Sequence, residues 1–209
     1  MNSSDWRDRP ASAHFGSICW QSRLLGLLTA IFARPVLAAL TVIGIVINRF
    51  SPHTLQRARF DVIDKPLRVV PPPAGTQVTP VALPQCPAEW VVSPTARQSD
   101  RVIVYFHGSA LVTLGLNSHR RFVGKLSQET GARVLNIGYR LAPQARLEDA
   151  VSDGLDAYRY VMSLGFSADR IVLAGDSAGG MVAAGTALAA RDSGLPELDP
   201  IGWTGRGGS

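Results

Sequence analysis

The sequence predicts an α/β fold, in which helices lie on both faces of a mostly parallel sheet. Short apolar runs alternate with longer segments of helical period between residues 76 and 200. The run Val102–Phe106 consists of five consecutive apolar residues, which is typical of a strand buried on both faces. Because a strand, a helix and a strand joined in this order form a parallel unit, we expect about five strands and three crossover helices.

The first two strands follow a proline-rich loop. Residues 71–75 read PPPAG, a composition typical of a loop, and we place a domain boundary there. Val78–Leu83 alternates loosely between apolar and other residues and predicts the first strand, and Trp90–Val92 predicts the second. This boundary and the end of the core divide the chain into three parts: residues 1–75, 76–200 and 201–209.

Helices and strands alternate through the rest of the core. After Val102–Phe106 the expected elements are a helix over Ser118–Thr130, a strand over Val134–Ile137, a helix over Val151–Met162, a strand over Ile171–Ala174 and an alanine-rich helix over Met181–Arg191. Phe122 and Leu126 share one face of the first helix, and Gly131 and Gly165 are typical ends of the first and second. Four residues form the apolar stripe of the second helix: Val151, Leu155, Tyr158 and Met162.

The N-terminal part holds two apolar segments, each too short to span a membrane by itself. Leu24–Ala33 and Val36–Ile47 are separated by Arg34 and Pro35, and neither reaches the ~18 uninterrupted apolar residues of a transmembrane helix. We therefore expect buried or cap-like helices and a cytoplasmic protein without a signal peptide. Peripheral membrane contact through residues 24–47, as a hairpin or a tilted span, is the alternative.

Charge and cysteine content narrow the classes of function. The formal net charge of +5 is spread along the chain without a dense run of Lys and Arg, so no nucleic-acid partner is expected. Cys19 and Cys86 lie far apart, so we expect neither a disulfide framework nor a metal site.

The segment Gly175–Gly180, with the sequence GDSAGG, lies between an apolar run and an alanine-rich stretch. A strand, sharp turn and helix in this order place Ser177 at the apex, with its hydroxyl clear of the sheet. Gly175 and Gly179 lack a Cβ, so the strand and the helix can come close on either side. The helix N-terminus favours developing negative charge. The alternative is a glycine-rich turn in which the serine only caps the helix.

Two other motifs precede this turn. His107–Ala110, HGSA, comes directly after the buried strand Val102–Phe106, and Tyr139–Pro143, YRLAP, lies between HGSA and GDSAGG. In order and spacing the three motifs resemble the hormone-sensitive-lipase-like family of serine esterases and lipases, over roughly Val78–Leu198. The resemblance implies a partial α/β-hydrolase fold, with N-terminal helices that form a lid over the site.

The resemblance also implies roles for residues of the motifs. Ser177 would be the nucleophile that attacks the acyl carbonyl of a small ester, and backbone N–H groups of Ser109, Ala110 and Ala178 would form the oxyanion hole. His107 corresponds to the first residue of the oxyanion loop, which is structural in this family. The other motif residues with a structural role are Gly108, Gly175, Asp176, Gly179 and Gly180. No cofactor and no metal are implied.

The sequence departs from the family pattern in the oxyanion loop. Ser109 and Ala110 stand where the family has two glycines. If the loop needs a positive φ at these positions, each side chain costs ~1–3 kcal/mol. We therefore expect a weakened oxyanion hole or a changed acyl preference.

A second departure concerns the catalytic base. In this fold the acid and then the histidine of the triad follow the serine along the chain. All histidines of this sequence precede Ser177: His14, His53, His107 and His119. Asp192 and Asp199 follow it, but at the end of the elbow helix and just beyond it. Residues 201–209 are glycine-rich where an apolar strand is expected. We infer from the pattern that the C-terminal third of the fold is absent, as a premature stop would explain.

Two hypotheses follow from this departure. The chain is a serine carboxylesterase or lipase of the family, completed by a partner that supplies a histidine after Ser177. Alternatively, it is a catalytically inactive truncated fragment, membrane-associated or not, that by itself aggregates through the unpaired edge of Ile171–Ala174. An unrelated ligand-binding α/β domain is a third interpretation, which the three ordered motifs disfavour.

Overall fold

The computed structural model describes residues 42 and 64–196, and the chain divides into two units, residues 1–55 and 56–209. The helices expected over residues 24–47, apart from the helical Val42, and the tail of residues 201–209 lie outside the described part. The expectations about a lid, membrane contact and the tail therefore stay predictions. Among the described residues, no helix has both the length and the apolar character needed to cross a membrane.

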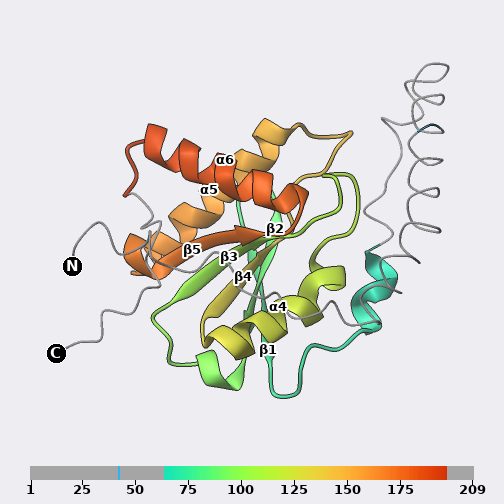
Figure 1. Cartoon of the computed structure of the whole chain (residues 1–209), viewed down its shortest axis with the longest axis vertical. Coiled ribbons are helices and arrows are strands. Elements are labelled where there is room, and N and C mark those ends of the chain that lie inside the picture. Colours follow the sequence, from blue (N-terminus) through green and yellow to red (C-terminus); the bar gives the residue numbers. More distant parts are fainter. Residues whose placement is uncertain (1–41, 43–63, 197–209) are drawn as a thin grey trace, which may run out of the picture. The chain divides into compact units, whose positions relative to one another are not determined.

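Five strands of the second unit form one mixed sheet in the order β1-β2-β4-β3-β5 (Figure 1). Their bounds are β1 (Gln77–Ala82), β2 (Pro87–Val92), β3 (Val102–Phe106), β4 (Arg133–Ile137) and β5 (Ile171–Gly175). β2 pairs antiparallel with β1 and with β4, and β3 pairs parallel with β4 and with β5. Of the described strands only β2 runs against the others, so the predicted mostly parallel sheet is confirmed.

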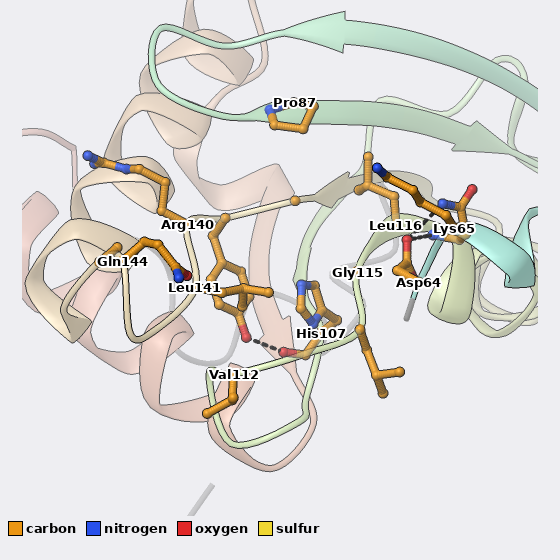
Figure 2. Close-up of a pocket in the computed structure, with 15 residues that line it drawn as sticks. Asp64, Lys65, Pro87, His107, Val112, Gly115, Leu116, Arg140, Leu141 and Gln144 are labelled. Atoms are coloured by element: carbon orange, nitrogen blue, oxygen red, sulfur yellow. Dashed lines mark hydrogen bonds between the residues drawn. The ribbon is translucent and has the colours of Figure 1, made fainter. Parts of the chain in front are cut away.

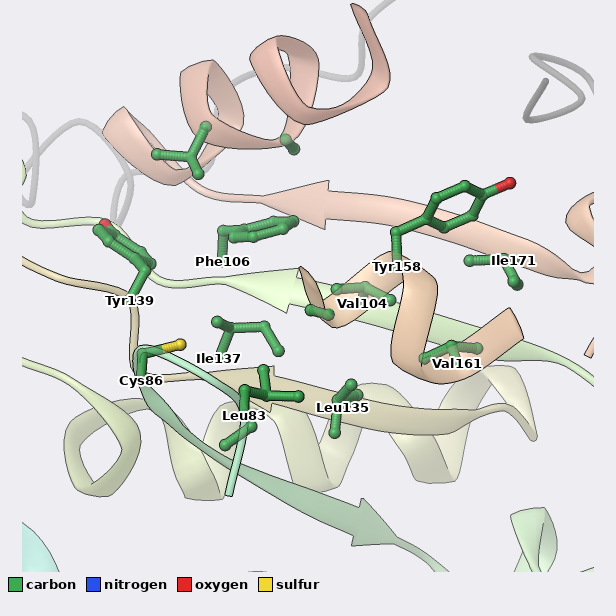
Figure 3. Close-up of a cluster of buried hydrophobic side chains, with 14 of the residues drawn as sticks. Leu83, Cys86, Val104, Phe106, Leu135, Ile137, Tyr139, Tyr158, Val161 and Ile171 are labelled. Carbon is green, nitrogen blue, oxygen red and sulfur yellow. The ribbon is translucent and has the colours of Figure 1, made fainter. Parts of the chain in front are cut away.

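Three helices cover the two faces of this sheet, as predicted: α4 (Leu116–Thr130), α5 (Leu147–Ser163) and α6 (Ala178–Asp192). On one face Val123 of α4 packs with Ile103 and Val134. On the other face Phe106 lies in a core cluster with Tyr158 of α5 and with residues of α6 (Figure 3). Side chains alternate between the two faces along a strand, and all residues of β3 are buried. Both faces of β3 are therefore covered, which explains its uninterrupted apolar sequence.

Three short 3-10 helices complete the described elements: η3 (Lys65–Val69), η4 (Pro94–Ala96) and η5 (Ala168–Arg170). β2 also begins earlier than predicted, at Pro87, which pairs with Ala82 of β1, and the next residues, Ala88 and Glu89, pair with both β1 and β4. Pairing with two neighbours supports a strand at residues of low β propensity.

All three long helices begin earlier than the apolar periodicity predicts. α4 does so because the Asp64 carboxylate, distant in sequence, accepts hydrogen bonds from the N–H groups of Asn117 (3.0 Å) and Ser118 (2.8 Å). Burial of Asp64 disfavours its charge, but these donors hold its pKa below the ordinary value. The start of α5 is supported by Asp149, whose carboxylate accepts the N–H of Arg146 at 2.8 Å.

Candidate active site

Ser177 lies at the sharp turn between β5 and α6. Its φ of 49° and ψ of −120° place a non-glycine residue in a region of backbone space that typically costs ~1–3 kcal/mol. The residue is exposed, and its hydroxyl makes no hydrogen bond with any residue that the structure describes. The turn therefore presents an unengaged hydroxyl group at the N-terminus of a helix.

Two glycines permit the close approach of strand and helix at this turn. A Cβ on Gly175 would lie 2.5 Å from the carbonyl carbon of Gly179, and a Cβ on Gly179 would lie 2.0 Å from the carbonyl oxygen of Phe106. Real Cβ atoms do not approach other atoms so closely. Gly180 differs, because its Cβ would meet only the carbonyl oxygen of Gly175 at 3.5 Å.

Asp176 connects the turn to the HGSA loop. Its carboxylate accepts a hydrogen bond of 2.8 Å from the backbone N–H of Gly108 and one of 2.7 Å from the hydroxyl of Tyr105. Burial opposes the charge of this carboxylate, but the two donors hold its pKa below the ordinary value. A Cβ on Gly108 would lie 2.1 Å from the carboxylate of Asp176, so this contact also requires glycine.

The loop after β3 has an unusual number of left-handed residues that are not glycine. The φ angle is 112° at Ser109, 56° at Ala110, 63° at Leu111 and 64° at Leu114. The condition stated from the sequence, a positive φ at Ser109 and Ala110, is thus met, and each side chain typically costs ~1–3 kcal/mol. The hydroxyl of Ser109 donates a hydrogen bond to the carbonyl of Thr113, which holds the loop together.

The imidazole of His107 is buried beneath this loop. Its Nδ1 lies 2.9 Å from the carbonyl oxygen of Gly108, which can only accept, so Nδ1 carries the proton. Burial lowers the pKa of His107 and favours the neutral ring. The ring stacks on Tyr139 of the YRLAP motif, with 4.4 Å between centroids and 15° between planes. The hydroxyl of Tyr139 donates to the backbone carbonyl of His107 at 2.6 Å.

His119, in the first turns of α4, lies close to the same group of residues. Its Nε2 is 3.7 Å from the Asp176 carboxylate, and its Nδ1 is 2.9 Å from the hydroxyl of Ser118. Within residues 64–196, neither His107 nor His119 forms a hydrogen bond with Ser177. The described residues thus bring the three motifs together without placing a histidine against the serine hydroxyl.

Sequence reasoning did not identify His119 or Tyr105 as neighbours of the turn. For Tyr105 a signal existed, because a tyrosine at the end of a buried strand needs a partner for its hydroxyl. For His119 there was none, since the packing of α4 beside the end of β3 is a tertiary feature.

A cavity of about 580 Å³ lies between the loop after β3 and the loop after β4 (Figure 2). Its walls are largely apolar and include Val112, Leu116 and Leu141, and His107 and Tyr139 also line it. Its lining includes none of the residues predicted for nucleophile and oxyanion hole, Ser109, Ala110, Ser177 and Ala178. In the described residues, no group of three His, Cys, Asp or Glu side chains is arranged to hold a metal ion.

Known proteins that are similar to this chain are esterases and lipases, and part of the chain matches an α/β-hydrolase family model. The family model described as the alpha/beta hydrolase fold matches residues 103–203. Carboxylesterase/phospholipase LipF of Mycobacterium tuberculosis is 38% identical over 161 residues, which are 76% of this chain and 42% of that protein. Hormone-sensitive lipase of Homo sapiens is 36% identical over 116 residues, which are 54% of this chain and 11% of that protein.

Solved structures of esterases share the fold. The crystal structure of an esterase from the bacterial hormone-sensitive lipase family superposes with a TM-score of 0.61 at 32% identity, covering 75% of this chain and 53% of that one. The chain thus spans about half the length, or less, of the relatives it matches. The resemblance to hormone-sensitive-lipase-like esterases, stated from three motifs, is confirmed. Residues 103–203 of this chain therefore match the family described as the alpha/beta hydrolase fold.

Proposed function

We propose that this chain carries the nucleophile and the oxyanion-binding loop of a serine hydrolase that acts on small acyl esters. The observation that supports this most directly is the backbone of Ser177, whose φ of 49° is a strained conformation for serine. Strain of this kind persists where the surrounding structure enforces it, and it is common at functional sites. Nothing in a simple capped turn requires it, because an N-cap residue ordinarily has an extended backbone.

The proposed chemistry is acyl transfer. The Ser177 oxygen attacks the acyl carbonyl carbon and loses its proton to a base, while the carbonyl electrons move onto oxygen. The N–H groups of Ala178, Ser109 and Ala110 donate to this oxyanion, and each such donor contributes ~3 kcal/mol to lowering the barrier. The intermediate then expels the alcohol, which takes the proton, and water hydrolyses the acyl-serine to the acid and free serine.

The base for this reaction is not among the described histidines. Among the described residues, neither His107, whose Nδ1 donates to the Gly108 carbonyl, nor His119, which contacts Ser118 and Asp176, forms a hydrogen bond with the Ser177 hydroxyl. We therefore propose that a histidine from outside residues 64–196, in this chain or a partner, completes the site. In serine hydrolases with a triad of this kind, loss of the histidine lowers turnover by ~10⁶, so we expect a loss of this size where no base is supplied.

Exogenous imidazole offers a test that supplies the missing base. The chain is assayed with 4-nitrophenyl acetate in increasing imidazole, beside Ser177→Ala and the control Ser167→Ala, which changes another exposed serine in a turn. After subtraction of the rate of imidazole alone, we expect a saturable, imidazole-dependent rate in the wild type and in Ser167→Ala, unaffected by a chelator and absent from Ser177→Ala. Mass spectrometry should locate the acetyl group on Ser177. Equal rates in all three proteins, with no acetyl-serine, would reject the proposal.

A second candidate function is binding of acyl esters without hydrolysis. It is favoured by one observation, the lack of a base near Ser177 among the described residues. In this case 4-nitrophenyl acetate turnover stays at the level of Ser177→Ala even in saturating imidazole. A non-hydrolysable ester analogue, such as the corresponding methyl ketone, should still raise the melting temperature of the chain.

A further inference from the structure

We propose that Tyr139 is a positioning residue for the oxyanion loop, because it restrains two successive peptide groups, the second of which carries the N–H of Ser109. The inference rests on the proposed function, since that function assigns this N–H to the oxyanion. Tyr139 itself lies in the YRLAP motif after β4 and does not belong to the strand or the loop that it restrains.

The first peptide group joins His107 and Gly108 and is held at both ends. Its carbonyl accepts the Tyr139 hydroxyl at 2.6 Å, and its N–H donates to the Asp176 carboxylate at 2.8 Å. A trans peptide is planar, and its C=O and N–H point in opposite directions. The group is therefore fixed between two side chains, and it cannot rotate without breaking one of these bonds.

The second peptide group joins Gly108 and Ser109. Its carbonyl accepts a hydrogen bond from Nδ1 of His107 at 2.9 Å, so the N–H of Ser109 points away from the imidazole. That imidazole is stacked on Tyr139 at 4.4 Å. Tyr139 thus acts on the first peptide through its hydroxyl and on the second through its ring, which limits the movement of His107.

Tyr139 is well suited to this role, because it is itself immobilised. Its side chain is only 2% exposed, and burial, together with the charge of Asp176, raises the pKa of the hydroxyl, which therefore remains a donor. The next residue, Arg140, donates its backbone N–H to the fully buried carboxylate of Asp153 at 2.8 Å. This bond anchors the YRLAP segment to α5.

The test separates positioning from simple stabilisation with a matched control. Tyr139→Phe keeps the ring and removes the hydroxyl. The control Tyr158→Phe removes a similar bond, since the hydroxyl of the buried Tyr158 donates to the carbonyl of Pro196 at 2.7 Å, a residue outside the HGSA motif. Two quantities are measured in the full chain: exchange of the Gly108 amide hydrogen by NMR, and the rate at which a fluorophosphonate labels Ser177 in saturating imidazole.

In Tyr139→Phe we expect the Gly108 amide to exchange at least tenfold faster and Ser177 to be labelled about tenfold more slowly. In Tyr158→Phe both quantities should stay at the wild-type values, although both variants lose similar stability. If the two variants behave alike, Tyr139 has only a structural role and the inference is wrong.

A second variant, at Asp176, tests whether Tyr139 and Asp176 hold the same peptide group. Asp176→Asn weakens the other end of the same peptide group, so its effect on labelling should overlap with that of Tyr139→Phe. The double variant is then expected to react faster than the product of the two single effects predicts. If the effects of the two substitutions on the labelling rate simply multiply, Tyr139 and Asp176 do not act on the same peptide group. If even the wild type is never labelled at Ser177, the proposed function fails, and exchange of the Gly108 amide alone decides whether Tyr139 holds the loop.

Discussion

The carboxylate of Asp176 accepts a hydrogen bond of 2.8 Å from the backbone N–H of Gly108, and this bond joins two motifs that are 68 residues apart. The bond engages one of the two oxygens of the Asp176 carboxylate. That oxygen, Oδ1, is shared between Gly108 and the Tyr105 hydroxyl. The turn with the serine and the loop with the strained residues are therefore held in fixed relation by one side chain.

Replacing Ser177 with glycine should stabilise the protein. Glycine adopts a φ of 49° and ψ of −120° without the penalty of a side chain, which is ~1–3 kcal/mol, but it loses up to ~1 kcal/mol of chain entropy. We expect the free energy of unfolding in urea to rise by about 1 kcal/mol in Ser177→Gly. Ser167→Gly is the control, since its φ of −82° carries no such strain, and it should lower stability slightly. A loss of stability in both variants would contradict strain at the turn.

Ala110→Gly should also be stabilising, for a reason located in the loop. Ala110 has a φ of 56°, and its methyl group is exposed, so glycine relieves strain without removing packing. Urea denaturation is expected to show a gain of about 1 kcal/mol. Ala184, exposed in the middle of α6, gives the opposite case, and Ala184→Gly should lose about 1 kcal/mol of helix propensity. The two substitutions are chemically identical, so a gain in one and a loss in the other isolates the effect of backbone conformation.

Two neighbouring glycines of GDSAGG should differ sharply in their tolerance of alanine. A Cβ on Gly179 would lie 2.0 Å from the carbonyl oxygen of Phe106, whereas one on Gly180 meets only a contact of 3.5 Å. Gly179→Ala is expected to lose about 3 kcal/mol or more, because the end of β3 and the start of α6 must separate. Gly180→Ala should be neutral or slightly stabilising, since alanine favours the helix. Thermal melting of the two variants measures the difference, and similar melting temperatures would count against the close packing.

Asp64 should make stability depend on pH in the acid range. Its folded pKa is lowered, despite burial, by hydrogen bonds from Ser118 and Asn117. The carboxylate therefore contributes stability above its unfolded pKa of ~3.9, and that contribution is lost as the pH falls through the lower folded value. Between neutral pH and pH values below ~4, the free energy of unfolding should change less in Asp64→Asn than in the wild type. Parallel pH curves for the two proteins would rule out this contribution.

Local sequence patterns predicted most of the fold. Val102–Phe106 could be assigned as a doubly buried strand because five apolar residues in succession leave no polar face. The glycines of GDSAGG predicted a close strand-to-helix turn, because removal of a Cβ is the local chemistry that close approach demands. The helix starts were less predictable. The cap of α4 comes from Asp64, which lies 53 residues before Asn117, and no periodicity reveals a cap so distant in sequence.

The residue types of the candidate site were determined by the sequence, but their arrangement depends on the tertiary structure. Ser177, Gly108 and Asp176 could be singled out from three short motifs. That Tyr139 holds the carbonyl of His107 and that His119 lies 3.7 Å from Asp176 could not, because these contacts depend on how β4 and α4 pack around the end of β3. A sequence pattern encodes conformation over a few residues, whereas contacts between distant segments are selected only when the whole sheet and its helices pack together.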